Sequence, residues 1–366
     1  MLAVILLLVP AVAAAALPFL DRPWGRSAGW AVAALFAVLT VALLATAPSI
    51  LAGQAQTVTV EWLPSLGIAF RLHLDGLALM FCLMALVVGA LVKVYGTRYF
   101  PTGPQGSVYA VMTLFALGML GLVLAGDMLL LYLFWELTTI CSFLLIGREG
   151  AKGAPPAVRT VILTAAGGMC LLMAAALVWV ATGTTDLSVI LGDTSWTEGG
   201  TGTAVMLLLI TAAFTKSAQF PVHFWLPDAM AASTPVSAYL HAATMVKAGV
   251  YLLLRFSPAF AESPLWQVLL IGMGLLTALY GALVAVTRDD LKELLAYSTI
   301  SQLGLIIAAI GIGSTEALVA ASVHTLAHAL YKAGLFMVVG IVDHEAQART
   351  LSQVRGMGRR LPVTAA

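Results

Sequence analysis

Long apolar stretches dominate the pattern of hydrophobic and polar positions along this chain. Eleven of them approach or exceed the roughly 20 residues that an α-helix needs to cross a bilayer. They run approximately over residues 2–20, 28–48, 73–96, 107–125, 128–147, 157–181, 203–223, 234–256, 264–286, 291–312 and 316–342. The pattern predicts an all-α, polytopic membrane protein with about eleven transmembrane helices.

One stretch between the second and third apolar segments follows a different pattern. Within residues 54–72, polar and apolar side chains alternate over 56–60, and residues 68–72 resemble a second strand. The intervening Pro64–Gly67 segment has the composition of a turn. Alternation with a period of two on either side of a turn is typical of a β-hairpin. We therefore expect a short hairpin in an external loop.

Prolines interrupt the seventh and eighth apolar segments. Residues 211–255 contain Pro221, Pro227 and Pro235. Proline inside a helix removes a backbone hydrogen bond and kinks or breaks the helix. At membrane depth the freed backbone groups must be satisfied within the protein or by water. These prolines predict broken helices.

Composition agrees with a membrane protein, because 61% of the 366 residues are hydrophobic and 10% are charged. Soluble domains are about one-quarter charged. Cys82, Cys141 and Cys170 are scattered through apolar segments and match neither a zinc site nor a disulfide framework. The chain has no nucleotide-binding loop and no haem or iron–sulfur pattern. We therefore predict a non-enzymatic protein without cofactor, metal or nucleic-acid partner.

The basic residues of the loops predict an orientation in the cell membrane. The odd-numbered loops contain 13 Lys or Arg residues, whereas the even-numbered loops contain only Arg71 and Arg255. The acidic loop 186–198 also lies on the even-numbered side. Lys and Arg accumulate on the cytoplasmic side of membranes. The N-terminus is therefore expected outside, and the residues after 343 in the cytoplasm.

Glu136 lies inside the fifth apolar segment, with Thr138, Thr139 and Ser142 close by in sequence. A carboxylate at this depth must be protonated or paired with a cation. A static ion pair is one interpretation. The functional interpretation is a carboxylate that exchanges a proton with a neighbouring lysine.

The broken segments carry three basic side chains. Lys216 precedes Pro221 by five residues, so it either snorkels towards the interface or switches between charged and neutral forms in a hydrated cavity. His241 and Lys247 are six residues apart, which is about 9 Å and roughly 240° on an α-helix. This spacing suits consecutive stations of a relay better than a metal pair. His241 alone is equally compatible with a hydrogen-bonded core histidine.

His324, His328 and Lys332 recur every four residues. This spacing places them along one helix face over about 12 Å. Two histidines at i and i+4 can bind zinc. However, no further ligand is placed to complete a metal shell, and the next group on the face is a cation. The pattern favours a file of titratable groups.

Other ionisable residues flank the segments. His223 and Asp228 lie on either side of the break around Pro227, where they could form a cytoplasmic inlet for protons. His73, Asp75 and Asp127 lie at segment ends. For these three residues, solvated or helix-capping roles are expected.

At these residues the chain resembles a known family. TKSAQFPVHFWLPDAMAASTPVSAYLHAATMVKAG is similar to the signature of the proton-conducting antiporter-like subunits of respiratory complex I, membrane hydrogenases and Mrp-type cation/proton antiporters. LKELLAYSTISQLGLI, VHTLAHALYKAGLFMVVGIVDHE and FWELTTICSFLLIG also match the family pattern. The MVKAG lysine, the His-Phe-Trp before LPDA and the GIVDHE ending most resemble the large A subunit of an Mrp-type sodium/proton antiporter.

The resemblance implies a proton relay. It assigns relay positions to Glu136, Lys216, His241, Lys247, His324, His328 and Lys332. Under this hypothesis Glu136 holds Lys216 charged, and a change in their separation releases the proton towards Lys332. The expected partners are the lipid bilayer, other antiporter subunits, protons and sodium ions.

The resemblance also implies two inverted five-helix repeats with broken helices. It divides the chain into N-terminal helices with the hairpin (1–104), a first repeat (105–257) and a truncated second repeat (258–366). The family's helix-twelve lysine and later helices would lie beyond Ala366, so a piece of a longer protein is expected. Ser233 stands where many relatives have proline.

Two other functions stay open. The chain could be a proton-pumping subunit of a complex I-like NADH-quinone oxidoreductase or a membrane hydrogenase, driven by electron transfer elsewhere. It could also be the membrane subunit of an inorganic-carbon uptake complex. Both use the same family of folds.

Overall fold

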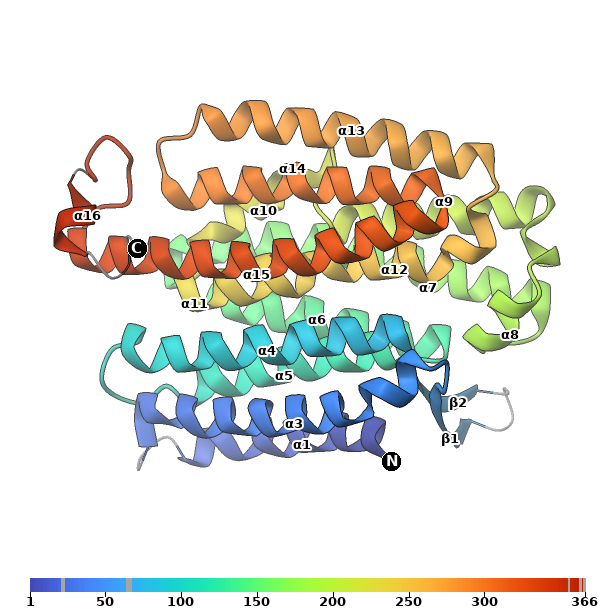
Figure 1. Ribbon diagram of the computed structural model, residues 1–366, viewed down its shortest axis with the longest axis horizontal. Coiled ribbons are helices and arrows are strands. Elements are labelled where there is room, and N and C mark those ends of the chain that lie inside the picture. The colour runs from blue at the N-terminus through green and yellow to red at the C-terminus, as the bar shows by residue number, and fades with distance from the viewer. Residues whose placement is uncertain (21–23, 64–67, 355, 362–363, 365–366) are drawn as a thin grey trace.

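The computed structural model describes residues 1–20, 24–63, 68–354, 356–361 and 364. Its long helices run side by side in one bundle (Figure 1). The two strands and α8 (Leu187–Gly192) lie at one end of the bundle, which we call the hairpin end. The short helix α16 (Met357–Arg360) lies at the opposite, C-terminal end.

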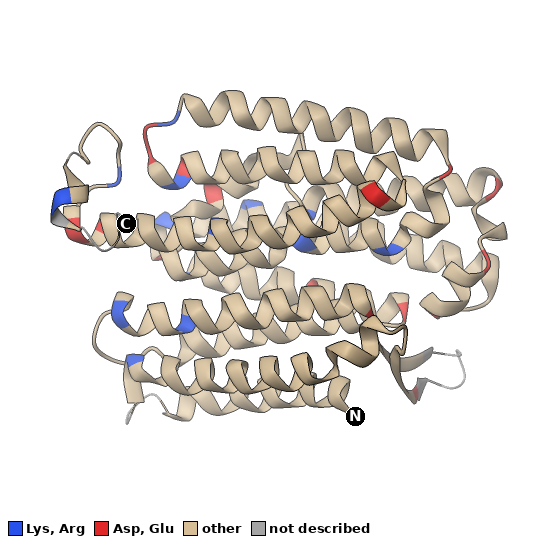
Figure 2. Ribbon diagram, in the orientation of Figure 1, with Lys and Arg blue, Asp and Glu red and all other residues tan. Residues whose placement is uncertain are grey.

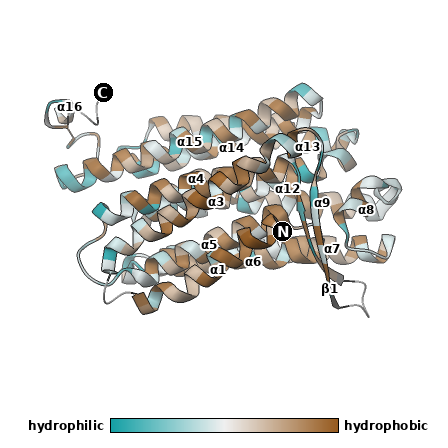
Figure 3. Ribbon diagram, turned by 60° about the horizontal axis from the view of Figure 1, so that its bottom comes forward, coloured by the Kyte–Doolittle hydropathy of each residue, from teal (hydrophilic) through white to brown (hydrophobic). Residues whose placement is uncertain are grey.

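Ten helical spans in the described part of the chain are long and apolar enough to cross a membrane. They comprise α1 (Leu2–Ala16) with η1 (Leu17–Leu20), η2 (Gly25–Ser27) with α3 (Ala28–Leu51), α4 (Gly76–Tyr99), α5 (Gly106–Leu124), α6 (Met128–Gly147), α7 (Ala154–Thr182), α9 (Gly199–Lys216), α13 (Pro264–Val286), α14 (Leu291–Ile312) and α15 (Thr315–Ala346). Apolar residues cover these helices along most of their length (Figure 3). The predicted multi-pass, all-α membrane fold is confirmed.

The predicted hairpin is also present. Strand β1 (Gln56–Leu63) pairs antiparallel with β2 (Ile68–Leu74), with Val58 opposite Leu72. A bulge shifts the register between Glu61 and Leu63. The predicted turn at Pro64–Gly67 lies outside the described residues.

Aspartates begin several of the helices at the hairpin end. The Asp75 carboxylate accepts a hydrogen bond from the Ala78 N–H at the start of α4. The Asp127 carboxylate accepts from the Leu129 and Leu130 N–H groups at the start of α6. These contacts satisfy amides that have no partner within the helix. The expected capping roles of both aspartates are confirmed.

The break after the seventh apolar segment comes earlier than predicted, because α9 ends at Lys216 rather than near residue 223. Ala218 adopts a positive φ of 49°, a conformation that is uncommon for a residue with a Cβ and incompatible with a continuing helix. Short turns follow: η6 (Val222–Phe224), α10 (Trp225–Asp228) and η7 (Ala229–Ala231). The Trp225 Nε1–H donates to the Thr215 carbonyl at 2.8 Å, which satisfies one freed backbone group inside the protein.

The eighth apolar segment is interrupted rather than forming one α-helix. It consists of α11 (Thr234–Ser237), the π-helix η8 (Ala238–Ala243) and α12 (Met245–Phe260). Thr244, with φ −129° and ψ −81°, separates the last two. The α-helical relation expected between His241 and Lys247 is therefore wrong, because a π-turn and a break lie between them. π-helical turns occur frequently at functional sites.

Candidate functional site

Buried ionisable side chains extend from α6 to α15 through the interior of the bundle. Most charged residues lie near helix ends and in loops, and few lie within the bundle (Figure 2). We call the seven predicted relay residues the ionisable line: Glu136, Lys216, His241, Lys247, His324, His328 and Lys332. Four of them are 0% exposed and Lys332 is 2% exposed. Charged groups at such depth are costly and are usually functional.

Glu136 and Lys216 lie close to each other, but no direct ion pair joins them. The Lys216 ammonium donates to the Trp135 carbonyl at 3.1 Å and to Thr139 Oγ1 at 2.7 Å. Both partners come from α6, immediately before Glu136 and one turn after it. The carboxylate and the ammonium still attract each other through space. Neutral groups of α6 on either side of Glu136 in the sequence thus hold the lysine.

A glycine on α7 creates the space that Glu136 occupies. A Cβ at Gly168 would collide with Glu136 Oε1. This oxygen is buried and has no hydrogen-bond partner among the described residues. An unpaired buried carboxylate oxygen is costly, so this carboxyl group is suited to carrying a proton.

His241 lies in the middle of the π-helix η8. It is fully buried, and neither ring nitrogen has a hydrogen-bond partner within the described part of the chain. Its ring meets the Trp225 ring edge-on, with 5.9 Å between centroids. The sequence was equally compatible with a core histidine held by hydrogen bonds, but no described residue forms such a bond with the His241 ring.

Lys247 and His328 form a direct contact between α12 and α15. The distance from Lys247 Nζ to His328 Nδ1 is 2.5 Å. An ammonium can only donate, so the facing ring nitrogen must then offer its lone pair. If Nδ1 carries a proton instead, the lysine must be neutral. In either case one proton lies between the two nitrogens.

The remaining groups of the line are held by α14. Lys332 Nζ donates to Ser298 Oγ at 2.8 Å, and His324 Nε2 donates to Gln302 Oε1 at 2.8 Å. The His324 and His328 rings are nearly parallel, with 6.5 Å between centroids. His324, His328 and Lys332 were predicted to share one face of α15. This prediction is confirmed, because all three side chains contact partners on α12 or α14.

The proposed inlet residues have separate partners. His223 is 7% exposed and lies among aromatic rings, stacked on Phe220 and edge-on to Tyr280. Asp228 forms an ion pair with Arg159 of α7 at 2.6 Å. An inlet role stays a prediction for both residues.

Sequence reasoning missed several polar partners and two buried lysines. Ser298 and Gln302 are four residues apart in an apolar helix, and this spacing matches that of His324, His328 and Lys332. A short connection makes α14 and α15 antiparallel, so the sequence does contain this signal. The 13 basic residues assigned to odd-numbered loops include Lys93 and Lys292, and for these two the assignment is wrong, because they lie in α4 and α14 and are 0% and 4% exposed. Their positions near segment ends conceal their burial.

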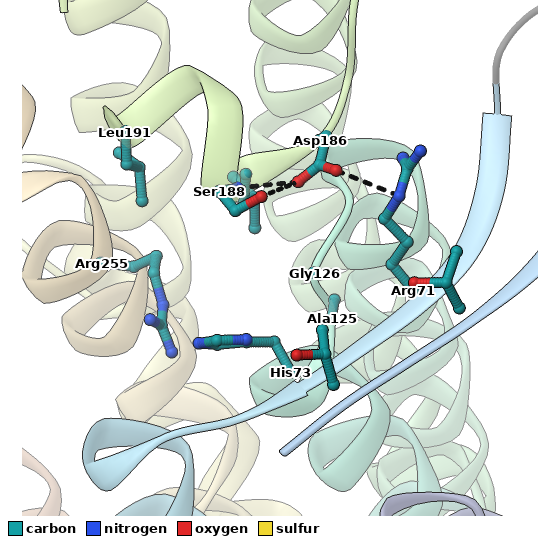
Figure 4. A pocket seen from close by; sticks show the side chains of 11 residues that line it. Arg71, His73, Ala125, Gly126, Asp186, Ser188, Leu191 and Arg255 are labelled. Carbon is teal, nitrogen blue, oxygen red and sulfur yellow. Dashed lines mark hydrogen bonds and ion pairs between the residues drawn. The ribbon is translucent and has the colours of Figure 1, made fainter. Parts of the chain in front are cut away.

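A second ionic cluster lies at the hairpin end, around a pocket of about 300 Å³ (Figure 4). Arg71 of β2 contacts Asp127 at 3.4 Å and Asp186 at 3.1 Å. Arg255 of α12 contacts Asp75 at 2.5 Å. The cluster connects the hairpin to the first residues of α4, α6 and α8.

Two of the capping aspartates of this cluster, Asp75 and Asp127, have opposite electrostatic environments. Burial alone would raise the pKa of Asp75, but hydrogen bonding and attraction from Arg255 hold that pKa below its usual value. Burial raises the pKa of Asp127, although hydrogen bonds from Thr185 and two backbone amides oppose the shift. Burial, ion pairing and hydrogen bonding thus compete at both sites.

No group of three or more His, Cys, Asp or Glu side chains among the described residues could hold a metal ion.

Comparison with known sequences identifies the family. The sequence profile of the NADH:quinone oxidoreductase/Mrp antiporter transmembrane family matches residues 125–366. This chain belongs to that family. The A subunit of the Na(+)/H(+) antiporter of Alkalihalophilus pseudofirmus is 41% identical over 377 residues, covering 97% of this chain and 47% of the relative. The chain thus spans about half the length of the curated relatives it matches.

Two solved structures have the same fold. A chain of the Mrp complex from Dietzia sp. DQ12-45-1b superimposes with a TM-score of 0.95 and 52% identity, covering 100% of this chain and 40% of that chain. A chain of the membrane-bound sulfane sulfur reductase, an archaeal respiratory membrane complex, gives a TM-score of 0.87 and 26% identity, covering 99% and 75%. The predicted resemblance to the large subunit of an Mrp-type antiporter is confirmed.

Proposed function

We propose that this chain is the proton-translocating part of a multisubunit sodium/proton antiporter in the plasma membrane. The observation that carries the proposal is the ionisable line, which places titratable side chains from Glu136 to Lys332 inside an apolar bundle. Similarity to the large Na(+)/H(+) antiporter protein of Alkalihalophilus pseudofirmus and to the Mrp complex supports sodium as the exchanged ion and other antiporter subunits as partners.

Proton transfer begins, in this proposal, at Glu136 and Lys216. Lys216 is bound by the Trp135 carbonyl and the Thr139 hydroxyl, so it can leave or approach the carboxylate without breaking an ion pair. A closer approach favours the charged lysine, and separation favours its neutral form. The released proton moves by way of water towards His241.

The proton then reaches the contact between Lys247 and His328. One proton lies between the two nitrogens, so an arriving proton is taken up on the outer side of this contact, at Lys247 Nζ or at His328 Nε2, which has no other partner among the described residues. His324 and Lys332 lie four residues to either side of His328 on α15, and each is held by a neutral α14 side chain. Neutral partners let both groups change protonation without leaving an unpaired carboxylate.

Loop charges support an external N-terminus and a cytoplasmic location for the residues after 343. Setting aside the buried Lys93 and Lys292 leaves eleven basic residues in odd-numbered loops against two in even-numbered ones. This asymmetry still favours the same orientation. The hairpin end is then external. The repeat boundaries near residues 105 and 258 also belong to this proposal.

The test uses everted membrane vesicles that contain the whole complex. We expect Lys216→Ala and Glu136→Ala each to abolish sodium-dependent proton flux while the complex still assembles. Lys152→Ala, at an exposed lysine beyond the end of α6, is the matched control and should transport normally. Full flux in an assembled Lys216→Ala or Glu136→Ala complex would overturn the relay.

A redox-driven pump is the second candidate, because the sulfane sulfur reductase complex contains a chain of the same fold. A sodium gradient imposed on vesicles without any respiratory substrate separates the two functions. An antiporter moves protons under this gradient alone. A redox-driven pump moves none, because it needs electron transfer in a partner protein.

A further inference from the structure

Lys93 is a buried cation outside the ionisable line. It lies in α4, is 0% exposed, and its ammonium has no hydrogen-bond partner among the described residues. The other buried lysines differ in this respect. Each of them makes a hydrogen bond within the described part of the chain: Lys216, Lys247, Lys292 and Lys332.

Two aromatic rings replace the missing partner. Lys93 Nζ is 4.0 Å from the centroid of the Phe36 ring of α3 and 4.8 Å from that of the Tyr239 ring of η8. Gly89, one turn earlier on α4, leaves space for them, since a Cβ there would lie 2.9 Å from Phe36 and 3.0 Å from the Tyr239 hydroxyl. Ring faces attract cations, most strongly where water is excluded.

Tyr239 connects this contact to the ionisable line. It precedes His241 by two residues in the same π-helix. Its hydroxyl donates to the Ala85 carbonyl of α4 at 3.1 Å, and its own carbonyl accepts from Thr244 Oγ1 at 2.6 Å. Thr244 is the residue at which η8 ends and α12 begins.

We propose that Lys93 is a positioning residue for proton transfer. Its contact with Tyr239 holds η8 against α4 and thereby fixes both the place of His241 and the start of α12, which carries Lys247. The effect of Lys93 on proton flux rests on the proposed function, whereas its effect on the position of η8 does not. Through Lys93, the N-terminal helices α3 and α4 set the geometry of the relay segment.

Hydrogen–deuterium exchange of the purified complex tests the structural part of the proposal. In Lys93→Met, peptides covering residues 238–247 should exchange faster than in the parent, by about fivefold for the loss of one cation–π contact. Lys93→Arg retains a cation over the rings and should restore the parent rate. Leu91→Met, at a 52% exposed position of the same helix, is the control. Unchanged exchange in Lys93→Met would overturn the proposal.

Transport by the same variants tests the functional part. Lys93→Met should slow sodium-dependent proton flux several-fold and displace its pH profile, and Lys93→Arg should restore both. Normal flux with an unchanged profile in Lys93→Met would reduce Lys93 to a packing role. If Lys93→Met fails to assemble, Lys93→Gln takes its place in both measurements. If the parent itself shows no flux, the proposed antiport fails, and the exchange result still decides the role of Lys93 at η8.

Discussion

At the scale of single residues, the buried lysines are bound by neutral groups rather than by carboxylates. Lys216 contacts a carbonyl and a hydroxyl, Lys247 an imidazole, and Lys332 a hydroxyl. A carboxylate partner would add the attraction of a full opposite charge, which favours the charged form of a lysine. Neutral partners therefore keep each ammonium in place without committing it to the charged state. This compromise suits a group that must release its proton.

Thr139 should be necessary for this balance. Thr139→Val removes the hydroxyl that accepts from Lys216 but preserves the shape of the side chain. A hydrogen bond to a charged group contributes about 1.5–3 kcal/mol, so sodium-dependent proton flux should fall roughly tenfold or more. Thr139→Ser keeps the hydroxyl and should retain most of the flux. Equal flux in the Val and Ser variants would contradict this prediction.

At the scale of elements, small residues let α13 and α14 approach closely. A Cβ at Gly304 would lie 2.5 Å from the Gly274 carbonyl oxygen and 2.6 Å from the Ala278 nitrogen. Both are backbone atoms, which cannot move aside as a flexible side chain can. Close contact between small residues is a common basis for helix association in membranes, where the hydrophobic effect between helices is weak. It keeps α14 in place for Ser298 and Gln302.

Gly304→Ala should therefore destabilise the protein, although alanine is the better helix former. Overpacking of this kind costs about 1–3 kcal/mol, and it should lower the melting temperature of the purified complex. Gly334→Ala is the matched control on α15, because a Cβ there meets nothing within 4 Å. That variant should match or slightly exceed the parent in stability. A Gly304→Ala complex as stable as Gly334→Ala would refute the close packing.

At the scale of the whole molecule, the ionic cluster at the hairpin end joins elements that are distant in sequence. Arg71 of the hairpin reaches Asp127 and Asp186, and Arg255 reaches back to Asp75. These contacts connect the N-terminal helices to the segments that carry the ionisable line. All three carboxylates also begin helices, so each one stabilises both a helix end and a tertiary contact.

The Asp75–Arg255 contact should make the stability of the fold depend on pH in the acidic range. The folded protein lowers the pKa of Asp75 from its ordinary value of 3.8. The ionised carboxylate therefore contributes its full share of the free energy of unfolding above pH 3.8. This share is lost as the pH falls towards and through the lowered pKa of the folded state. Asp127, with a raised pKa, acts in the opposite direction. Asp75→Asn should cost on the order of 1–3 kcal/mol near neutral pH, and the cost should shrink in acid.

Melting temperatures of the parent and Asp75→Asn complexes, measured from about pH 7 down to about pH 3, check this prediction. Asp127 is present in both proteins, so its contribution cancels in the difference. Glu198→Gln, at an exposed carboxylate in the loop between α8 and α9, is the control and should show little effect. A difference between parent and Asp75→Asn that stays constant over this range would argue against the ion pair.

Local patterns predicted much of this fold and of its candidate site. Ten of the eleven apolar segments, the two hairpin strands and the caps at Asp75 and Asp127 depend on residues close together in the chain, and all of these are present in its described part. The i, i+4, i+8 spacing of His324, His328 and Lys332 likewise predicted their shared face. The burial of Lys93 could not be predicted, because its distance from the end of α4 does not reveal whether neighbouring helices cover it. The π-helix around His241 was missed because a π-turn has no comparable sequence signature.

By itself, the sequence determined that the chain is a multi-pass membrane protein, and it identified the residues of the ionisable line. It could do so because the cost of placing polar groups in a bilayer acts on each segment separately. Only the tertiary structure decided which of these groups touch. In the tertiary structure, Lys216 donates a hydrogen bond to Thr139 and forms no ion pair with Glu136. Lys247 contacts His328, and Lys93 lies between the rings of Phe36 and Tyr239. Such contacts depend on how separate helices pack, and no single segment carries that information.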